Sequence, residues 1–145
     1  MVHYLVKIIF LVFIIMPKNI HSCSILGFDR EVHILNNLPP NSPQLEFHCA
    51  SGDDDLGYHY PAIGTDFNWK FCAFINTLFF CHFWWGDKDL PYDVFNSVDS
   101  CVWDGEDFVP PDTVKCLWKV QDDGFYLGFF DENVNENIYK KYRDW

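Results

Sequence analysis

Apolar and polar residues alternate with a period of two in several segments of the chain, as in strands with one face in a core and one in water. The alternating positions are Val32 and Ile34, with Asn36 in register; Leu45, Phe47 and Cys49; Phe67, Trp69 and Phe71; and Val114, Cys116, Trp118 and Val120. Clusters of proline, glycine and aspartate separate these segments, and Asp112–Phe130 fits one hairpin with its turn at Asp123-Gly124. The pattern predicts an all-β fold, a small antiparallel β-sandwich.

The stretch Leu78–Gly86, LFFCHFWWG, is the most apolar of the predicted strands. Alternation places Phe79, Cys81, Phe83 and Trp85 on one face and Leu78, Phe80, His82 and Trp84 on the other. Both faces are largely apolar, which predicts a central strand that is covered on both sides or lies against a partner. Neighbouring side chains in a strand point to opposite faces, so Cys81 and His82 are not expected to form a nucleophile–base pair.

The N-terminus carries an apolar run, Leu5–Met16. As a helix this run would rise only about 18 Å, which is well short of the ~30 Å hydrocarbon layer of a bilayer. Small residues follow at Ser22 and Ser24, and this spacing suits signal peptidase. We therefore predict a secretory signal peptide at residues 1–24 and a secreted, extracellular domain at 25–145, without stable membrane insertion after cleavage. A buried strand or a short membrane anchor are the alternatives for the apolar run.

Charge narrows the possible partners. Removing residues 1–24 takes away Lys7 and Lys18 and no acidic residue, so the net charge changes from −11 to −13. Such an acidic chain is repelled by nucleic-acid backbones and by anionic membrane surfaces. The charge suits a soluble extracellular protein, or one that meets a basic surface.

Cysteines stand at positions 23, 49, 72, 81, 101 and 116. Secretion exposes them to an oxidising environment, which favours disulfides. No Cys-x-x-Cys or His-x-x-x-His pair is present to suggest a metal site. If Cys23 leaves with the signal peptide, five cysteines remain, enough for two disulfides and one free thiol. We favour the pairs Cys49–Cys116 and Cys81–Cys101, although the sequence leaves other pairings open.

Candidate chemistry is sparse. Asp53, Asp54 and Asp55 are adjacent acids without the alternating ligand spacing of an EF-hand, so they are predicted to form a solvated turn rather than a calcium site. No pair of carboxylates stands out for glycoside hydrolysis. We therefore predict a protein that is not an enzyme, with no cofactor and no catalytic residues. Aromatic residues make up 19% of the chain, and among them Trp84, Trp85 and Trp103 are candidates for a protein interface.

Several motifs, taken together and in order, resemble the plant self-incompatibility S1 proteins, also called S-protein homologues. They are VHILNNLPPNSPQLEFHCASGDDDLGYH, DFNWKF, TLFFCHFWWG, DVFN and CLWKVQDDGFYL, and they cover about residues 31 to 128. The resemblance implies a small secreted β-sandwich with a signal peptide and two disulfides. It also implies a signalling ligand, because the founding members are secreted by the stigma and reject self pollen by acting on a pollen-surface receptor.

The resemblance also implies roles for particular residues. The family's disulfide cysteines match Cys49, Cys81, Cys101 and Cys116, whereas Cys72 is additional and is predicted to be a free thiol or an intermolecular bridge. Segment Val102–Asp112 is long for the family. Receptor contacts are expected in the loops Asp53–Pro61 and Gly86–Pro91, with Asp53, Asp54, Asp55, Tyr58, Trp84, Trp85 and Asp87 as the candidate residues.

The function predicted from the sequence is therefore that of a secreted, monomeric plant ligand. It would bind a cell-surface receptor protein in pollen rejection or in related cell–cell signalling. Two alternatives remain open at this point. One is a secreted carbohydrate- or calcium-binding module, and the other is a hydrolase of cell-wall glycans.

Overall fold

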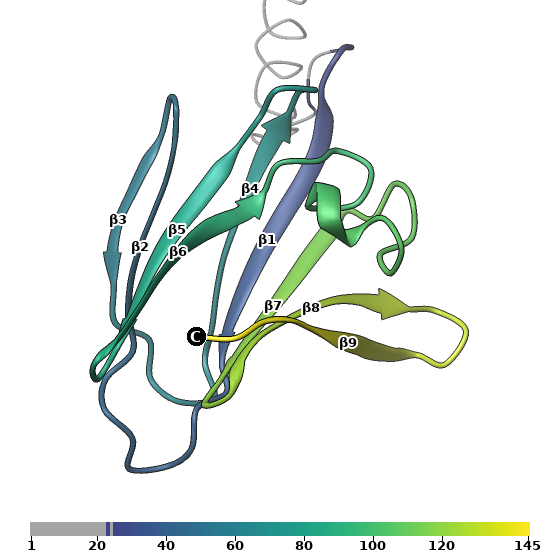
Figure 1. Ribbon diagram of the computed structural model, residues 1–145. Helices are drawn as coiled ribbons and strands as arrows, with labels where there is room; N and C mark the ends of the chain where they lie inside the picture. The colour runs from purple at the N-terminus through teal and green to yellow at the C-terminus, as the bar shows by residue number, and fades with distance from the viewer. Residues whose placement is uncertain (1–22, 24) are drawn as a thin grey trace, which may run out of the picture.

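The computed structural model describes Cys23 and residues 25–145, and it shows two β-sheets packed face to face (Figure 1). The five-stranded sheet has the order β4 (Asp66–Ala73), β1 (Phe28–Asn36), β7 (Lys115–Gln121), β8 (Gly124–Asp131) and β9 (Glu136–Arg143). The four-stranded sheet has the order β3 (Asp55–His59), β2 (Glu46–Ser51), β5 (Phe79–Trp85) and β6 (Lys88–Phe95). Apart from Cys23, the predicted signal peptide lies outside the described residues.

The predicted β-sandwich is confirmed, and the alternating segments are its strands. Apolar residues of each segment point into one core, where Val32, Phe47 and Trp118 are fully buried. The exception is Val114, which precedes β7 and is 48% exposed. The predicted hairpin is the β7–β8 pair. All strand pairs in both sheets are antiparallel except β1 with β7, which run parallel. Within the described residues, the only helical element is a short 3-10 turn, η1 (Trp103–Gly105).

Large aromatic side chains fill the space between the sheets. Trp118 of β7 donates a hydrogen bond from Nε1 to the carbonyl of Val94 in β6, at 2.9 Å, and so ties the two sheets together. The ring of Phe83 lies 5.4 Å from that of Phe47 and 4.9 Å from that of Phe125. Tilted ring pairs at this spacing stabilise a core beyond the area that they bury. Much of the aromatic content therefore serves the core.

The loops expected to contact a receptor are mostly strands. Asp55–His59 forms β3 and Lys88–Phe95 forms β6, so only the tight turns beside them are loops. Strand β5 is central, as predicted, but it is covered on one face only. Phe79, Cys81 and Phe83 are buried in the core, whereas Phe80 is 39% exposed on the opposite face.

The favoured disulfide pairing was wrong. Cys49 pairs with Cys81 and Cys101 pairs with Cys116, instead of Cys49–Cys116 and Cys81–Cys101. Cys49 and Cys81 are direct cross-strand partners in β2 and β5, and both side chains are buried in the core. Their Cα atoms are 4.1 Å apart, so each finds its partner in its own sheet and not across the sandwich.

Cys72 also has a partner within the chain. It is bonded to Cys23, with the Cα atoms 5.4 Å apart, so it is neither a free thiol nor an intermolecular bridge. The bond attaches the chain before β1 to strand β4. Cleavage after Ser24, as predicted from the sequence, would remove Cys23 and with it this disulfide.

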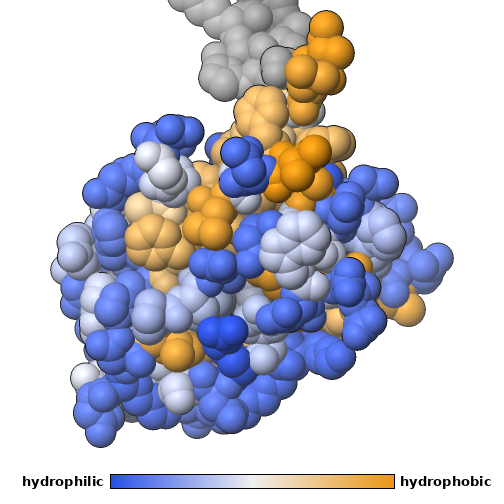
Figure 2. Space-filling view, turned by 45° about the horizontal axis from the view of Figure 1, so that its top comes forward, coloured by the Kyte–Doolittle hydropathy of each residue, from blue (hydrophilic) through white to orange (hydrophobic). Residues whose placement is uncertain are grey.

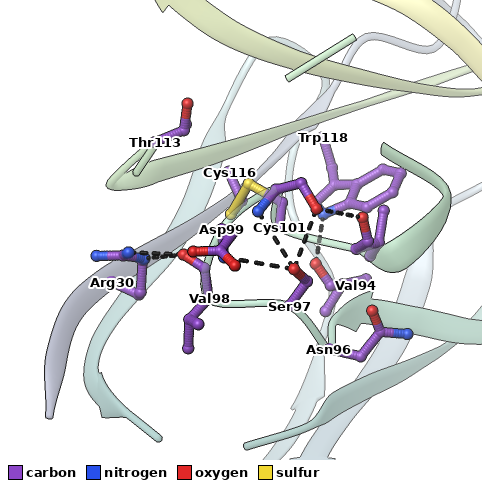
Figure 3. The surroundings of a disulfide bond; sticks show 12 residues. Arg30, Val94, Asn96, Ser97, Val98, Asp99, Cys101, Thr113, Cys116 and Trp118 are labelled. Atoms are coloured by element: carbon purple, nitrogen blue, oxygen red, sulfur yellow. Dashed lines mark hydrogen bonds between the residues drawn. A yellow bond between two sulfur atoms is a disulfide. The ribbon is translucent and has the colours of Figure 1, made fainter. Parts of the chain in front are cut away.

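The Cys101–Cys116 disulfide fastens the segment after β6 to β7 (Figure 3). Ser97 and Ser100 are buried beside it, and their hydroxyl oxygens are 3.0 Å apart. Arg30 of β1 donates to the carbonyl of Val98 from Nε at 3.0 Å and from Nη2 at 2.6 Å. Burial lowers the pKa of Arg30, against the opposing effect of nearby aspartates. The long segment between β6 and β7 is therefore held in place near its start, by the contacts of Val98 and Cys101.

Candidate functional site: the outer faces of the two sheets

The outer face of the four-stranded sheet carries rings surrounded by carboxylates. Side chains that point away from the core form rows across the strands because paired residues share a face. One row contains Tyr58, His48, His82 and Pro91; the next contains Glu46, Trp84 and Asp89; the third contains Ala50, Phe80 and Asp93, with Asp55 beside Ala50. We call the outward side chains of Glu46, His48, Asp55, Tyr58, Phe80, His82, Trp84, Asp89 and Asp93 the acid–aromatic face.

The rings at its centre are stacked on one another. The centroids of His82 and Trp84 are 3.9 Å apart with an interplanar angle of 25°, and those of His48 and Tyr58 are 4.7 Å apart at 29°. Tyr58 and Trp84 connect the two pairs, at 6.1 Å and 24°. Tyr58 is 59% exposed although it stacks on both His48 and Trp84. The result is a preformed aromatic surface open to solvent.

Each of its histidines contacts an aspartate. Nε2 of His48 lies 2.6 Å from Oδ1 of Asp55, and Nε2 of His82 makes a short hydrogen bond with Oδ1 of Asp89. Asp55 also accepts a hydrogen bond from the backbone N–H of Gly57 at 2.9 Å. That backbone donor, and after it the His48 ring, lower the pKa of Asp55. Asp55 is therefore held in its ionised form by its own surroundings.

No lysine or arginine points outward from the four strands of this completely described sheet. The hydrogen bonds found for its carboxylates within the described chain use one oxygen of each. The acceptors are Oε1 of Glu46, Oδ1 of Asp55, Oδ1 of Asp89 and Oδ2 of Asp93. An ionised carboxylate has about four acceptor positions on its two oxygens. The face therefore has carboxylate oxygens that are free to accept further hydrogen bonds, and histidine is the only residue type on it that can carry a positive charge.

The residues predicted to contact a receptor are only partly brought together. Asp55, Tyr58 and Trp84 lie on the acid–aromatic face. Asp53 and Asp54 form the β2–β3 turn, where Ser51 Oγ accepts hydrogen bonds from both backbone N–H groups at 3.3 and 3.0 Å.

The other two predicted residues lie elsewhere. Asp87 belongs to the β5–β6 turn at the opposite end of the sheet, a strand length or about 20 Å away. Trp85 points to the core side, where its Nε1 donates to the carbonyl of Pro43 at 3.1 Å and its ring packs on Trp145.

The outer face of the five-stranded sheet has a different character. It is hollowed by about 1000 Å³, and Leu35, Leu117 and Tyr139 are among the residues that line the hollow. Nδ1 of His33 lies 2.6 Å from Oδ2 of Asp66, and its Nε2 lies 3.1 Å from Oε1 of Glu31. Lysines are interspersed with these acids, at positions 70, 115, 119 and 141. Opposite charges therefore balance one another on this sheet.

A third surface is apolar. Figure 2 shows orange side chains gathered at the end of the molecule where the described chain begins. This end contains the start of β1 and the β4–β5 connection, and the Cys23–Cys72 disulfide attaches the chain before β1 to the end of β4 there. Its exposed residues are Ile25, Leu26, Phe28, Phe74, Ile75 and Leu78, of which Ile25 is fully exposed.

Metal binding has little support among the described residues. The one group of potential ligands there with atoms within 4.8 Å of one another is Cys23, Asp29 and Cys72. Its two cysteines are joined in a disulfide, and the thiolate is the form that binds metals. The group does not include Asp53, Asp54 or Asp55. Asp53 and Asp54 lie in the β2–β3 turn, as predicted, whereas Asp55 is the first residue of β3.

A scan against family models matches residues 31–145 to the family described as plant self-incompatibility protein S1. The chain belongs to this family. The match spans every strand from within β1 to β9, so S1 membership applies to the whole sandwich and not to a single motif.

The S1-family chain is also similar to individual plant proteins. It is 32% identical over 111 residues to self-incompatibility protein S1 of Papaver rhoeas, which covers 75% of this chain and 74% of that protein. It is 33% identical over 102 residues to S-protein homolog 24 of Arabidopsis thaliana, covering 68% of this chain and 61% of the relative. It is 37% identical over 82 residues to S-protein homolog 19 of the same plant, covering 50% and 60%.

This chain thus spans about three fifths of the length of these two homologs. No solved structure matches it. Among the described residues, no helix is long and apolar enough to cross a membrane.

Sequence reasoning missed six of the nine residues of the acid–aromatic face. These six, which were not among the candidate residues, are Glu46, His48, Phe80, His82, Asp89 and Asp93. The only available signal was their period of two along the strands, which places them opposite the core residues of the same segments. Their convergence depends on the pairing of β2, β5 and β6, which alternation alone does not specify.

Proposed function

We propose that this S1-family protein is a secreted signalling ligand that binds a receptor protein on the surface of plant cells. The observation that carries the proposal is the family match over residues 31–145. The Papaver relative is named self-incompatibility protein S1, which makes pollen rejection one candidate response and related cell–cell signalling another.

The physical character of the protein supports an extracellular binding role. Three disulfides hold the described domain together, and such bonds persist in oxidising compartments. The acid–aromatic face offers rings and carboxylates that no element of the described residues covers. These features support a protein that acts by binding.

Processing of the N-terminus is part of the proposal. We infer removal of a signal peptide, and the Cys23–Cys72 bond favours a mature chain that begins at or before Cys23 instead of at Ile25. N-terminal sequencing of protein secreted by plant cells gives the boundary directly. A mature chain that starts at Ile25 would leave Cys72 without the partner that it has here.

Saturable binding to cells tests the receptor. Fluorescently labelled mature protein is added to intact plant cells, with an excess of unlabelled protein as competitor. We expect binding that saturates, that the competitor displaces and that brief protease treatment of the cells abolishes. Binding that rises linearly with concentration and resists competition would contradict a receptor.

A further inference from the structure

We propose that the acid–aromatic face is the receptor-contacting surface, and that it accommodates an arginine-bearing segment of the partner protein. This inference rests on the proposed function and adds to it the surface and the chemistry of the partner. It differs from the expectation of loop recognition, because the residues that carry it lie on the strands β2, β3, β5 and β6.

Charge is the first argument. The face contains Glu46, Asp55, Asp89 and Asp93 and no lysine or arginine, whereas the opposite sheet intersperses lysines with its acids. Complementary potentials steer encounters and set the orientation of a bound partner. A second copy of this chain, related by two-fold symmetry, would place the same acids against one another. A basic partner is therefore the one that this face fits.

The arrangement of rings and carboxylates is the second argument, and it selects arginine. A guanidinium is planar, stacks on aromatic rings and donates paired hydrogen bonds to a carboxylate. Trp84 lies in the same row as Asp89, and His82 stacks on Trp84 while it contacts that aspartate. One arginine side chain can therefore meet a ring and a carboxylate oxygen together. A neutral sugar would use the rings but would leave the charge of four carboxylates unmatched.

Exposure of the face is the third argument. Tyr58 is 59% exposed and Phe80 is 39% exposed, and the ring of Tyr58 is already stacked with those of His48 and Trp84. Binding to such a surface orders few side chains, so little conformational entropy is lost. Aromatic residues surrounded by polar ones are also the usual composition of a binding hot spot.

Short immobilised peptides test the chemistry. Three are compared: alternating arginine and glycine, alternating lysine and glycine, and alternating citrulline and glycine. Citrulline keeps the planar shape of arginine without its charge. We expect the arginine peptide to bind most tightly, the lysine peptide on the order of tenfold more weakly, and the citrulline peptide not at all. Equal binding of the citrulline and arginine peptides would overturn the proposal.

Matched variants locate the binding. Asp89→Asn removes an acid that contacts a histidine on the acid–aromatic face, and Asp66→Asn makes the same change on the opposite face. Tyr58→Ala and Tyr126→Ala form a second pair. We expect the first member of each pair to weaken arginine-peptide binding on the order of tenfold, and the second to leave it within about twofold. Equal effects of Asp89→Asn and Asp66→Asn would mean that overall charge, and not this face, is responsible, and equal effects of the two tyrosine variants would likewise overturn the assigned face.

Binding to intact cells separates this inference from the function on which it rests. Saturable, protease-sensitive binding of the wild-type protein that Asp89→Asn and Tyr58→Ala weaken supports both. Saturable binding that these variants leave unchanged overturns the face and keeps the receptor. The absence of saturable binding overturns the receptor itself. Binding that survives protease but is displaced by cellohexaose or xylohexaose overturns the arginine partner in favour of a cell-wall glycan. A near-ultraviolet circular dichroism spectrum like that of the wild type confirms that each variant is folded.

Discussion

The two sheets of this protein share one core but present opposite kinds of outer surface. On the four-stranded sheet, stacked rings lie among carboxylates with no lysine or arginine beside them. On the five-stranded sheet, lysines lie among acids, as where Lys141 contacts Asp123, and apolar side chains line an open hollow. One outer surface therefore carries charges of both signs, whereas the other carries carboxylates without lysine or arginine. Net charge alone would not have revealed this difference, because it sums over both.

The largest expected loss of stability comes from a substitution in the core that both sheets share. Trp118→Ala deletes a fully buried indole and its hydrogen bond to Val94, so the free energy of unfolding should fall by about 3–5 kcal/mol. Chemical denaturation measures the loss. Trp103→Ala is the matched control, because Trp103 is 61% exposed, and it should change stability by less than about 1 kcal/mol. Similar losses in both variants would contradict the assigned core.

A change beneath the acid–aromatic face alone should have the next largest effect. The double variant Cys49→Ala with Cys81→Ala removes the disulfide between β2 and β5, which closes a loop of 32 residues. In the chain-entropy model such a bond contributes about 3–4 kcal/mol. The measurement is denaturant unfolding, with peptide mapping to verify the other two disulfides. Unchanged stability would mean that this bond does not constrain the unfolded chain.

The five-stranded sheet has a close contact of its own. A Cβ atom on Gly128 would come within 2.5 Å of the Tyr139 ring and 2.6 Å of the carbonyl oxygen of Ile138. Gly128→Ala should therefore lower the free energy of unfolding by about 1–3 kcal/mol through overpacking. Gly52→Ala serves as control, because nothing lies within 4 Å of its added Cβ. Thermal unfolding compares the two, and equal melting temperatures would contradict the tight packing of β8 against β9.

The smallest effect is electrostatic and concerns the acid–aromatic face. The pKa of Asp55 is lowered in the folded protein, first by the Gly57 N–H and then by His48. A lowered pKa stabilises the fold above the unfolded value of about 3.9, and this contribution is lost as pH falls through the lower folded value. Asp55→Asn should therefore be less stable than the wild type at pH 7. The difference should shrink below pH ~3.9 and disappear once Asp55 is protonated in both states.

Unfolding curves at pH 7 and at about pH 2 test the titration of Asp55. The variant Asp53→Asn makes the same charge change in the neighbouring turn and should show a smaller difference at pH 7. A stability difference for Asp55→Asn that stays the same at both pH values would point to packing instead of titration.

The period of two in the sequence predicted the strands that bury one face in the core. It did not predict three of the four strands that lie at the edges of the sheets. β3, β6 and β9 were not anticipated, and each lies at the edge of its sheet. Edge strands bury less surface and tolerate residues that read as turns, such as Gly57 in β3 and Pro91 in β6. Strand β9 also lies at an edge and buries little surface, so its charged residues do not form an apolar–polar alternation.

The disulfide pairs and the candidate site depend on which strands are neighbours in a sheet, and the pattern within a single segment does not show this. The inward direction of Cys49 and Cys81 followed from alternation, but their pairing follows from the adjacency of β2 and β5. The same adjacency brings His48 beside His82 on the opposite face. The wrong disulfide pairs and the missed face residues have the same cause. A period of two predicts which face of the sheet a residue lies on, but it does not predict which strand lies beside it.

The parallel pairing of β1 with β7 has a consequence for the order in which the chain folds during synthesis. The four-stranded sheet is complete once Phe95 has been made, whereas β1 needs Lys115–Gln121 as one of its neighbours. Contacts so distant in sequence form slowly. We expect pulse-labelled hydrogen exchange to show protection of backbone amides in β5 and β6 before those of β1. The sheet that presents the acid–aromatic face would then form before β1 has paired with β7.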